Sequence, residues 1–141
     1  MSHRFLKTKH FVYKKNDYAD EMYFIITGRI LFVYGTDHFI FKQMPMGSYF
    51  GEIELIDQKP RDFSVLTEGP CELFVLGRNL FNYALNSYPK VAQKMRKIAI
   101  ERKRKNFEAK QEVIDLLEAV EVKKEVNLND LGGKDTIKAT A

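Results

Sequence analysis

The sequence predicts a mainly β domain followed by helices, and three observations support this fold class. Between Phe11 and Leu76, short runs of Val, Ile, Phe and Tyr alternate with turn residues, without helical periodicity. After Leu76, apolar residues recur every three or four positions, as they do in helices. The 141 residues, 45% of them hydrophobic and 30% charged, suffice for one globular domain with its own core. We therefore expect a β-sandwich or jelly-roll-like barrel over about 11–76 and helices over about 77–122.

Six candidate strands fill the first part of the chain. Thr27-Gly28 and Gly35-Thr36-Asp37 separate successive apolar runs, as the turns of tight hairpins do. The expected strands are 11–13, 22–26, 29–34, 38–44, 63–66 and 72–76.

The second part predicts two helices and a tail. A short helix is expected around Leu80–Leu85, and a longer one begins at Pro89, because proline suits a first helical turn. This longer helix either continues to about Val122 or breaks near Asn106. Residues 123–141 are expected to form a flexible tail.

An apolar stripe in the last helical segment needs a surface to cover it, and assembly of a homo-oligomer through the C-terminal helices would provide one. The stripe consists of Val113, Ile114, Leu116, Leu117 and Val120.

Several classes of protein are disfavoured by composition. The longest dense apolar segment, 22–34, is interrupted by polar residues and is shorter than the ~20 residues of a spanning helix. The first residues lack the apolar block of a signal peptide. The single Cys71 cannot form an intramolecular disulfide, which favours a reducing, cytosol-facing compartment.

The positive charge is concentrated in one segment. Between Lys90 and Lys110 there are nine Lys or Arg and two acidic residues, so the rest of the chain is mildly acidic despite a net charge of +4. The run Arg102–Lys105 is interpreted as a solvated helix face, with acidic lipid or an acidic neighbouring subunit as alternative partners. DNA is not an expected partner, because residues 107–141 are too short for a helix-turn-helix.

No metal site or catalytic group is predicted. His3, His10 and His38 are scattered and lack the spacing of metal ligands, and no Ser-His-Asp or Cys-His pairing is indicated. We expect no enzyme activity, and a metal-dependent cupin enzyme is the weakest alternative.

The segment 47–65 has the features of an anion site. Phe50-Gly51 allows close approach of the backbone to a bound group, and Glu52–Ile56 suits one helical turn with free N–H groups. Arg61 would add a bidentate guanidinium to a phosphate placed there. Glu52, which only accepts hydrogen bonds when ionised, suits a neighbouring sugar hydroxyl. Phosphate beside ribose indicates a nucleotide.

The stretch Phe50-Gly-Glu-Ile-Glu-Leu-Ile-Asp-Gln-Lys-Pro-Arg61-Asp-Phe-Ser-Val65 resembles the phosphate-binding cassette of cyclic-nucleotide-binding domains. Residues 17–28 resemble the first hairpin of that family, and Tyr88-Pro89 with 98–102 is similar to the last helix of cyclic-nucleotide-gated and hyperpolarisation-activated channels. The form Arg-x-Phe-Ser-Val resembles ciliate channel cassettes. The resemblance covers about residues 5–107 and implies an eight-stranded β-roll with C-terminal lid helices.

The family's site carries over residue by residue. By resemblance, Glu52 would hold the ribose 2′-hydroxyl, Arg61 the cyclic phosphate, and Arg102 would reach the purine. The backbone of Gly51, Ile53 and Glu54 would complete the anion site. The expected ligand site therefore comprises Phe50, Gly51, Glu52, Ile53, Glu54, Arg61, Asp62, Phe63, Ser64 and Arg102.

Three residues depart from the family pattern: Glu54 and Phe63 stand where small residues are usual, and Asp62 replaces Ala or Thr. A carboxylate about 4 Å from the phosphate would cost on the order of 4 kcal/mol, so binding requires Asp62 to point toward solvent. The Thr that would follow Arg61 commonly favours guanine, and its absence favours cAMP over cGMP.

The resemblance implies a regulatory domain on the cytoplasmic side of a membrane. It would bind cAMP or cGMP, without a metal, and would gate a parent ion channel or transporter through its C-terminal helices. One alternative is a degenerate domain without nucleotide, plugged by Glu54, Phe63 or part of 107–126, that serves as an interaction domain. A fragment of a kinase regulatory subunit is another.

Overall fold

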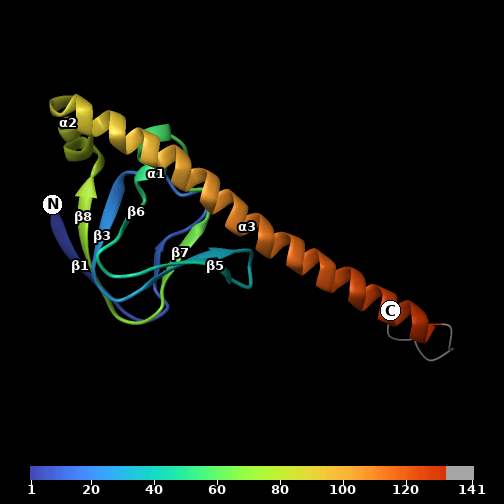
Figure 1. Ribbon diagram of the computed structural model, residues 1–141. Coiled ribbons are helices and arrows are strands. Elements are labelled where there is room, and N and C mark those ends of the chain that lie inside the picture. The colour runs from blue at the N-terminus through green and yellow to red at the C-terminus, as the bar shows by residue number, and fades with distance from the viewer. Residues whose placement is uncertain (133–141) are drawn as a thin grey trace.

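Two antiparallel sheets face each other across one core and form a β-roll (Figure 1). The structure is a computed structural model that describes the backbone of residues 1–132 and the side chains of residues 1–127. Within this part, eight strands form two sheets of four. The first sheet has the order β1 (Ser2–Leu6), β8 (Cys71–Gly77), β3 (Glu21–Thr27), β6 (Tyr49–Phe50), and the second has the order β2 (Phe11–Tyr13), β7 (Ser64–Thr67), β4 (Ile30–Tyr34), β5 (Phe39–Met44). The predicted mainly β fold with flanking helices is confirmed.

The core lies between the sheets because alternate residues of each strand point inward. Val65 of β7 and Leu73 of β8 belong to opposite sheets, and both are fully buried. Aromatic rings fill the end of the core nearest the cassette: Phe63 lies 4.7 Å from Phe32, measured between ring centroids. This packing brings the strand after the cassette against the centre of the roll.

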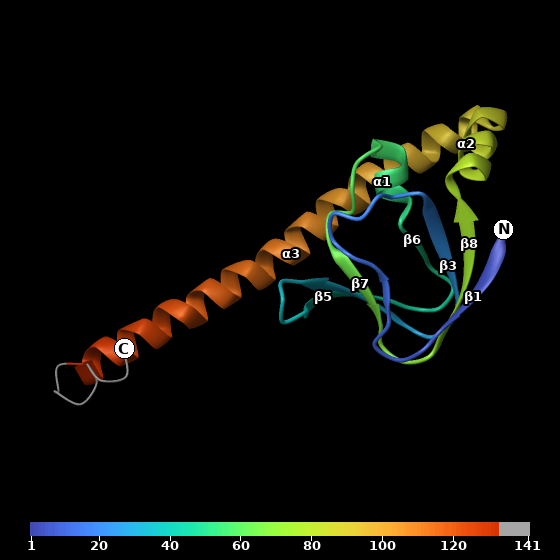
Figure 2. The same ribbon diagram turned by 180° about the vertical axis from the view of Figure 1, so that it is seen from behind.

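Three helices lie outside the sheets: α1 (Glu52–Asp57), α2 (Arg78–Ser87) and α3 (Pro89–Gly132). The apolar side of α2 packs through Phe81 into a second cluster that includes Met22 of β3 and Leu55 of α1. Helix α3 runs past α1 and β5 and then projects away from the roll (Figures 1 and 2). Its first half is therefore the part that can act on the cassette.

The six strands expected from the sequence are present within one or two residues, and two further strands were missed. Strand β1 has only two apolar residues and lies at an edge, where its register is set by pairing with β8. Strand β6 has two residues and pairs with Tyr23 and Phe24 of β3. Neither has the length or alternation that identifies a strand from sequence.

The expected end of the long helix was wrong. Helix α3 does not break near Asn106, because the Asn106 side chain is buried and accepts a hydrogen bond from the Lys42 ammonium at 2.9 Å. It also passes Val122 and continues to Gly132, so residues 123–132 are helical and do not form the expected tail. Between Asn106 and Val122, a side-chain pair one turn apart, Gln111 with Asp115, supports the helix. Residues 133–141 of the expected tail lie outside the described residues.

No helix within residues 1–132 combines the length and the apolar character that crossing a bilayer requires.

Removing the Leu73 side chain should destabilise the roll. We expect Leu73→Ala to lower the free energy of unfolding by about 2–5 kcal/mol, because it leaves a cavity between the sheets. Leu116→Ala is the matched control, since Leu116 on α3 is 65% exposed and its truncation should cost less than about 0.5 kcal/mol. Urea unfolding followed by circular dichroism measures both, and equal effects would contradict the described core.

Candidate functional site

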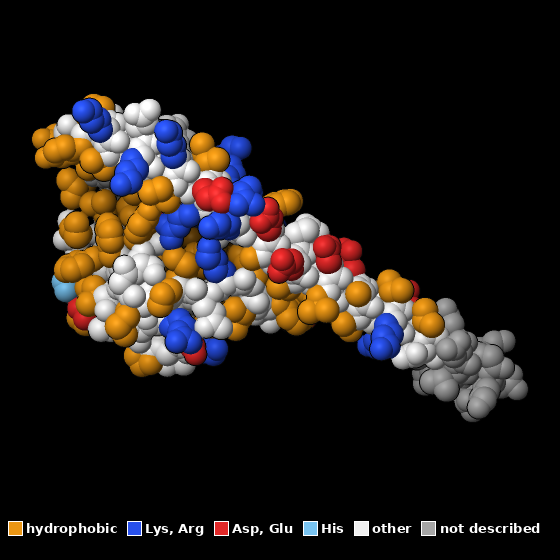
Figure 3. Space-filling model, in the orientation of Figure 1, with side chains coloured by type: hydrophobic (Ala, Val, Ile, Leu, Met, Phe, Trp, Pro, Cys, Tyr) orange, Lys and Arg blue, Asp and Glu red, His pale blue; other side chains and the backbone are white. Residues whose placement is uncertain are grey.

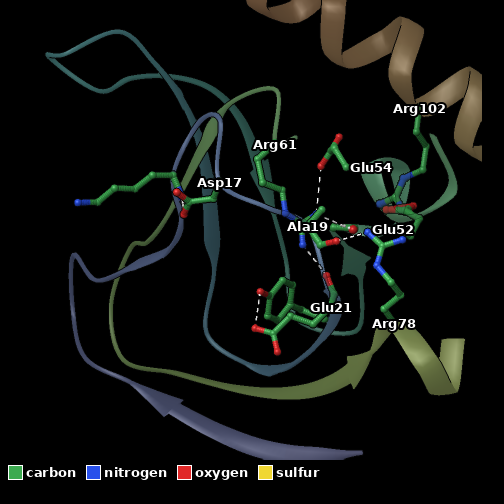
Figure 4. A network of polar contacts seen from close by, with 11 residues as sticks. Asp17, Ala19, Glu21, Glu52, Glu54, Arg61, Arg78 and Arg102 are labelled. Carbon is green, nitrogen blue, oxygen red and sulfur yellow. Dashed lines mark hydrogen bonds and ion pairs between the residues drawn. The ribbon is translucent and has the colours of Figure 1, made fainter. Parts of the chain in front are cut away.

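Arg61 is the centre of a buried polar network (Figure 4). One terminal nitrogen, Nη1, donates to the Gly51 carbonyl at 2.7 Å and to the Glu54 carboxylate at 3.1 Å. The other, Nη2, donates to the Glu21 carbonyl at 2.5 Å. The guanidinium also lies over the Tyr13 ring, 4.0 Å from its centroid. Arg61 thus joins β2, β3 and the start of α1.

One donor of Arg61 has no use in this network. Its Nε is buried, and none of the described residues offers it a hydrogen-bond acceptor. A buried donor without a partner costs about 1–3 kcal/mol. The first turn of α1, which begins after Gly51, likewise has no side-chain cap. These unused donors are the features that an anionic group would satisfy.

Gly51 allows α1 to approach Arg61 this closely. Its φ is +85°, in the left-handed region that favours glycine. A Cβ at this position would lie 3.0 Å from the Tyr23 ring and 3.3 Å from Arg61 Nη1. The cassette turn therefore depends on the absence of a side chain here.

Two carboxylates of α1 are buried at the site, and both have raised pKa values. Burial raises the pKa of Glu52, and the charge of Arg102 only partly opposes this effect. Burial also raises the pKa of Glu54, against the hydrogen bond and charge of Arg61. Each carboxylate is therefore paired with an arginine and still easier to protonate than an exposed glutamate.

Helix α3 reaches the cassette through Arg102. Its guanidinium donates to Glu52 at 2.5 Å and to the Tyr49 carbonyl at 2.7 Å, and it lies 4.3 Å from the centroid of the Tyr49 ring. One turn further along, Asn106 accepts the hydrogen bond from Lys42. Burial, together with the charge of Arg102, lowers the pKa of Lys42. Two polar contacts thus hold α3 across the mouth of the site.

The space between these elements is small. A cavity of about 10 Å³ remains, room for about one water molecule, whereas pockets for small ligands have about 300 Å³ or more. Its walls come from the roll, from α1 and from α3. The lining residues are Tyr13, Phe32, Lys42, Phe50, Gly51, Glu52, Ile53, Glu54, Phe63, Arg102 and Asn106.

Most of the residues expected at the site lie together, but three of them, Arg61, Asp62 and Ser64, do not line the cavity. Asp62 has a side chain that is 60% exposed and pairs with Lys110 of α3 at 3.4 Å, so it lies outside the cavity, although its charge contributes to the raised pKa of Glu54. The Ser64 hydroxyl accepts the backbone N–H of Lys15 at 2.9 Å. Phe63, which follows Asp62, is buried and lines the cavity, as strand alternation predicts.

Sequence reasoning missed Tyr13, Lys42 and Asn106. Tyr13 is the last residue of the expected strand 11–13, and alternation with Val12 indicates that its side chain points into the core. Lys42 and Asn106 are 64 residues apart in the chain, and no local pattern indicates that they meet.

The run Arg102–Lys105 has less free charge than its sequence suggests. Arg102 pairs with Glu52, Lys103 with Asp57, and Arg104 with both Glu101 and Glu108. Figure 3 shows basic side chains where α3 crosses the roll and acidic ones further along the helix. Within residues 1–127, no three His, Cys, Asp or Glu side chains gather as a metal-binding cluster.

Comparison with known proteins identifies the family of the chain. Residues 3–88 match the family model of the cyclic nucleotide-binding domain. A cyclic nucleotide-gated potassium channel of Rhizobium etli is 33% identical over 90 residues, which are 64% of this chain and 24% of the channel. The chain thus spans about a quarter of that relative.

Two solved structures share the fold. The regulatory domain of Toxoplasma gondii PKA with cAMP has a TM-score of 0.57 and 22% identity, over 67% of this chain and 38% of the other. The regulatory subunit of a cAMP-independent protein kinase A from Trypanosoma brucei has a TM-score of 0.58 and 17% identity, over 68% and 35%. The family match covers more than half of the sequence: the chain belongs to the cyclic nucleotide-binding domain family.

Proposed function

We propose that this domain senses a cyclic nucleotide and responds by releasing α3 from the cassette. The observation that carries the proposal is the buried pair of site residues, Arg61 with an unused Nε donor and Glu52 held by Arg102 of α3. The cyclic phosphate would accept hydrogen bonds from Arg61 and from the first N–H groups of α1. The ribose 2′-hydroxyl would donate to Glu52.

Binding and the position of α3 are coupled through Glu52. Its carboxylate is engaged by Arg102 at 2.5 Å, and the remaining cavity of about 10 Å³ cannot contain a nucleotide. A nucleotide that enters must displace Arg102 and Asn106, and α3 moves with them. The ligand shifts this equilibrium by the difference between its affinities for the open and the closed arrangement.

The effector is proposed to lie in a larger membrane protein. The Rhizobium etli relative is a cyclic nucleotide-gated potassium channel, which supports a parent channel or transporter with this domain on its cytoplasmic side. Helix α3 projects beyond the roll and is suited to pass on the movement (Figure 2). We propose a regulatory and non-enzymatic role, with cAMP favoured over cGMP because Asp62 stands in place of a hydroxyl residue.

A second candidate is a nucleotide-free interaction domain, and one observation favours it. Glu54 occupies a position on Arg61 that an anionic ligand would need, at 3.1 Å. If Glu54 replaces the ligand permanently, the fold persists without nucleotide and α3 stays closed. Titration with nucleotide separates the two candidates.

Calorimetry with cAMP and cGMP tests the sensor directly. We expect heat of binding for the wild type, and Arg61→Lys should weaken binding by about tenfold or more, because it loses a charge-assisted bidentate contact. Lysine keeps a positive charge beside Glu54, which limits the damage to the fold. Arg104→Lys, on the exposed side of α3, is the matched control and should leave affinity unchanged. Absence of heat at millimolar concentrations of both nucleotides would reject the sensor in favour of the second candidate.

Arg102→Ala should tighten nucleotide binding. The variant removes the contact that holds Glu52 and α3 together, so a larger fraction of molecules is open. The apparent Kd then falls in inverse proportion to that open fraction. Spin labels at Asp37→Cys and Leu116→Cys should show α3 moving away from the roll when cAMP is added. Weaker binding by Arg102→Ala would instead indicate that Arg102 contacts the purine.

Self-association through α3 is a separate proposal. Leu116, Val120 and Val126 are exposed on its projecting part. We expect a concentration-dependent increase in mass by analytical ultracentrifugation, and we expect Leu116→Glu with Val120→Glu to abolish it. Leu80→Glu with Tyr83→Glu places the same two charges on exposed positions of α2 and should leave the mass unchanged. A monomer at all concentrations would contradict assembly by this helix.

A further inference from the structure

Glu54 is placed as an internal anion at the site. It is the third residue of α1, its side chain is buried, and its carboxylate accepts from Arg61 Nη1 at 3.1 Å. The same nitrogen donates to the Gly51 carbonyl, at the turn where the cassette begins. An anion that used Arg61 and the first turn of α1 would therefore lie beside this carboxylate.

The cations near Glu54 are already paired with other groups, so they would not neutralise the charge of a second anion. Arg61 is its direct partner, and the charges of Glu52 and Asp62 act against its ionised form. Arg102 is engaged by Glu52, and Lys103 by Asp57. The titratable groups that face Glu54 or its partner come from every neighbouring element: Tyr13 of β2, Glu21 and Tyr23 of β3, Glu52 of α1, Arg61 and Asp62 of the following loop, and Arg102 and Lys103 of α3.

We propose that Glu54 competes with the ligand for Arg61, so that a cyclic nucleotide binds with the uptake of one proton by the Glu54 carboxylate. This inference rests on the proposed function and adds a residue that sets its dependence on pH. The proton comes from solvent and forms the O–H bond of a neutral carboxyl group. That group no longer repels the phosphate and donates a hydrogen bond to one of its oxygens.

Repulsion between the two anions is large enough to drive this uptake. Groups that share one guanidinium lie about 4 Å apart, and at an effective dielectric near 20 their repulsion corresponds to about a thousandfold in affinity. Burial already raises the pKa of Glu54 in the free protein, so the free-energy cost of protonating it on binding is smaller than for an exposed glutamate. Protonation is thus less costly than keeping both charges.

The sign of the pH dependence follows from linkage. The complex holds one proton more than the free protein at any pH between the pKa of free Glu54 and its higher pKa in the complex. Affinity therefore increases as the pH falls through this window, by up to tenfold per pH unit. The cyclic phosphate is a diester and keeps its single charge throughout, so the proton belongs to the protein.

Calorimetry with cAMP between pH 5.5 and 8, in buffers of low and high ionisation enthalpy, measures the uptake. For the wild type we expect up to one proton taken up and a Kd that decreases as the pH falls. Glu54→Gln keeps an acceptor for Arg61 without the charge, so it should take up no proton and bind at least tenfold more tightly than wild type at pH 8. Glu112→Gln removes a carboxylate from an exposed position of α3 that is not among the groups facing Glu54, so it is the matched control and should behave as wild type.

Other outcomes separate this inference from the sensor itself. Binding by the wild type without proton uptake, with Glu54→Gln unchanged in affinity, would overturn the inference and leave the sensor standing. If neither protein binds cAMP at any pH, both proposals fail. Should Glu54→Gln not fold, Glu54→Ala replaces it with the same expectation, and the wild-type proton count alone decides the outcome.

Discussion

The buried guanidinium of Arg61 is the interaction on which the site depends. A full positive charge inside the roll is tolerated because Gly51, Glu21 and Glu54 accept its hydrogen bonds and the Tyr13 ring covers its face. These partners come from the cassette turn, from α1 and from two strands in different sheets. The geometry of the cassette is therefore linked to the packing of both sheets, and Gly51 is the position where the backbone makes this close approach possible.

The second constraint is the contact between α3 and the cassette. Arg102 of α3 donates a hydrogen bond to Glu52 of the cassette, and Lys42 of β5 donates one to Asn106 of the same helix. These contacts and the aromatic packing of Phe63 leave almost no free volume. Because Arg102 of α3 is paired with Glu52, the proposed ribose-binding residue, nucleotide binding as proposed would be incompatible with this position of α3.

The three departures from the family pattern differ in their physical consequences. Asp62 lies outside the cavity and pairs with Lys110 of α3, and its charge reaches the site only by raising the pKa of Glu54. Phe63 contributes to the core that narrows the site. Glu54 is the one of the three that touches Arg61, and it adds a second buried carboxylate, beside Glu52, to the site. The chemistry of the site thus depends most on a residue whose sequence context is that of an ordinary helical turn.

Local patterns in the sequence were sufficient for the mainly β roll, six of its strands, the short helix before Pro89 and the spacing that joins Gly51 and Glu52 to Arg61. Alternation, turn residues and motif spacing are properties of neighbouring residues, and they can be read without coordinates. The continuation of α3 through Asn106, the edge strands β1 and β6, the Lys42–Asn106 contact and the pairing of Glu54 with Arg61 were decided only by tertiary structure. In each of these, burial or a partner on another element or loop outweighs the local preference of the chain.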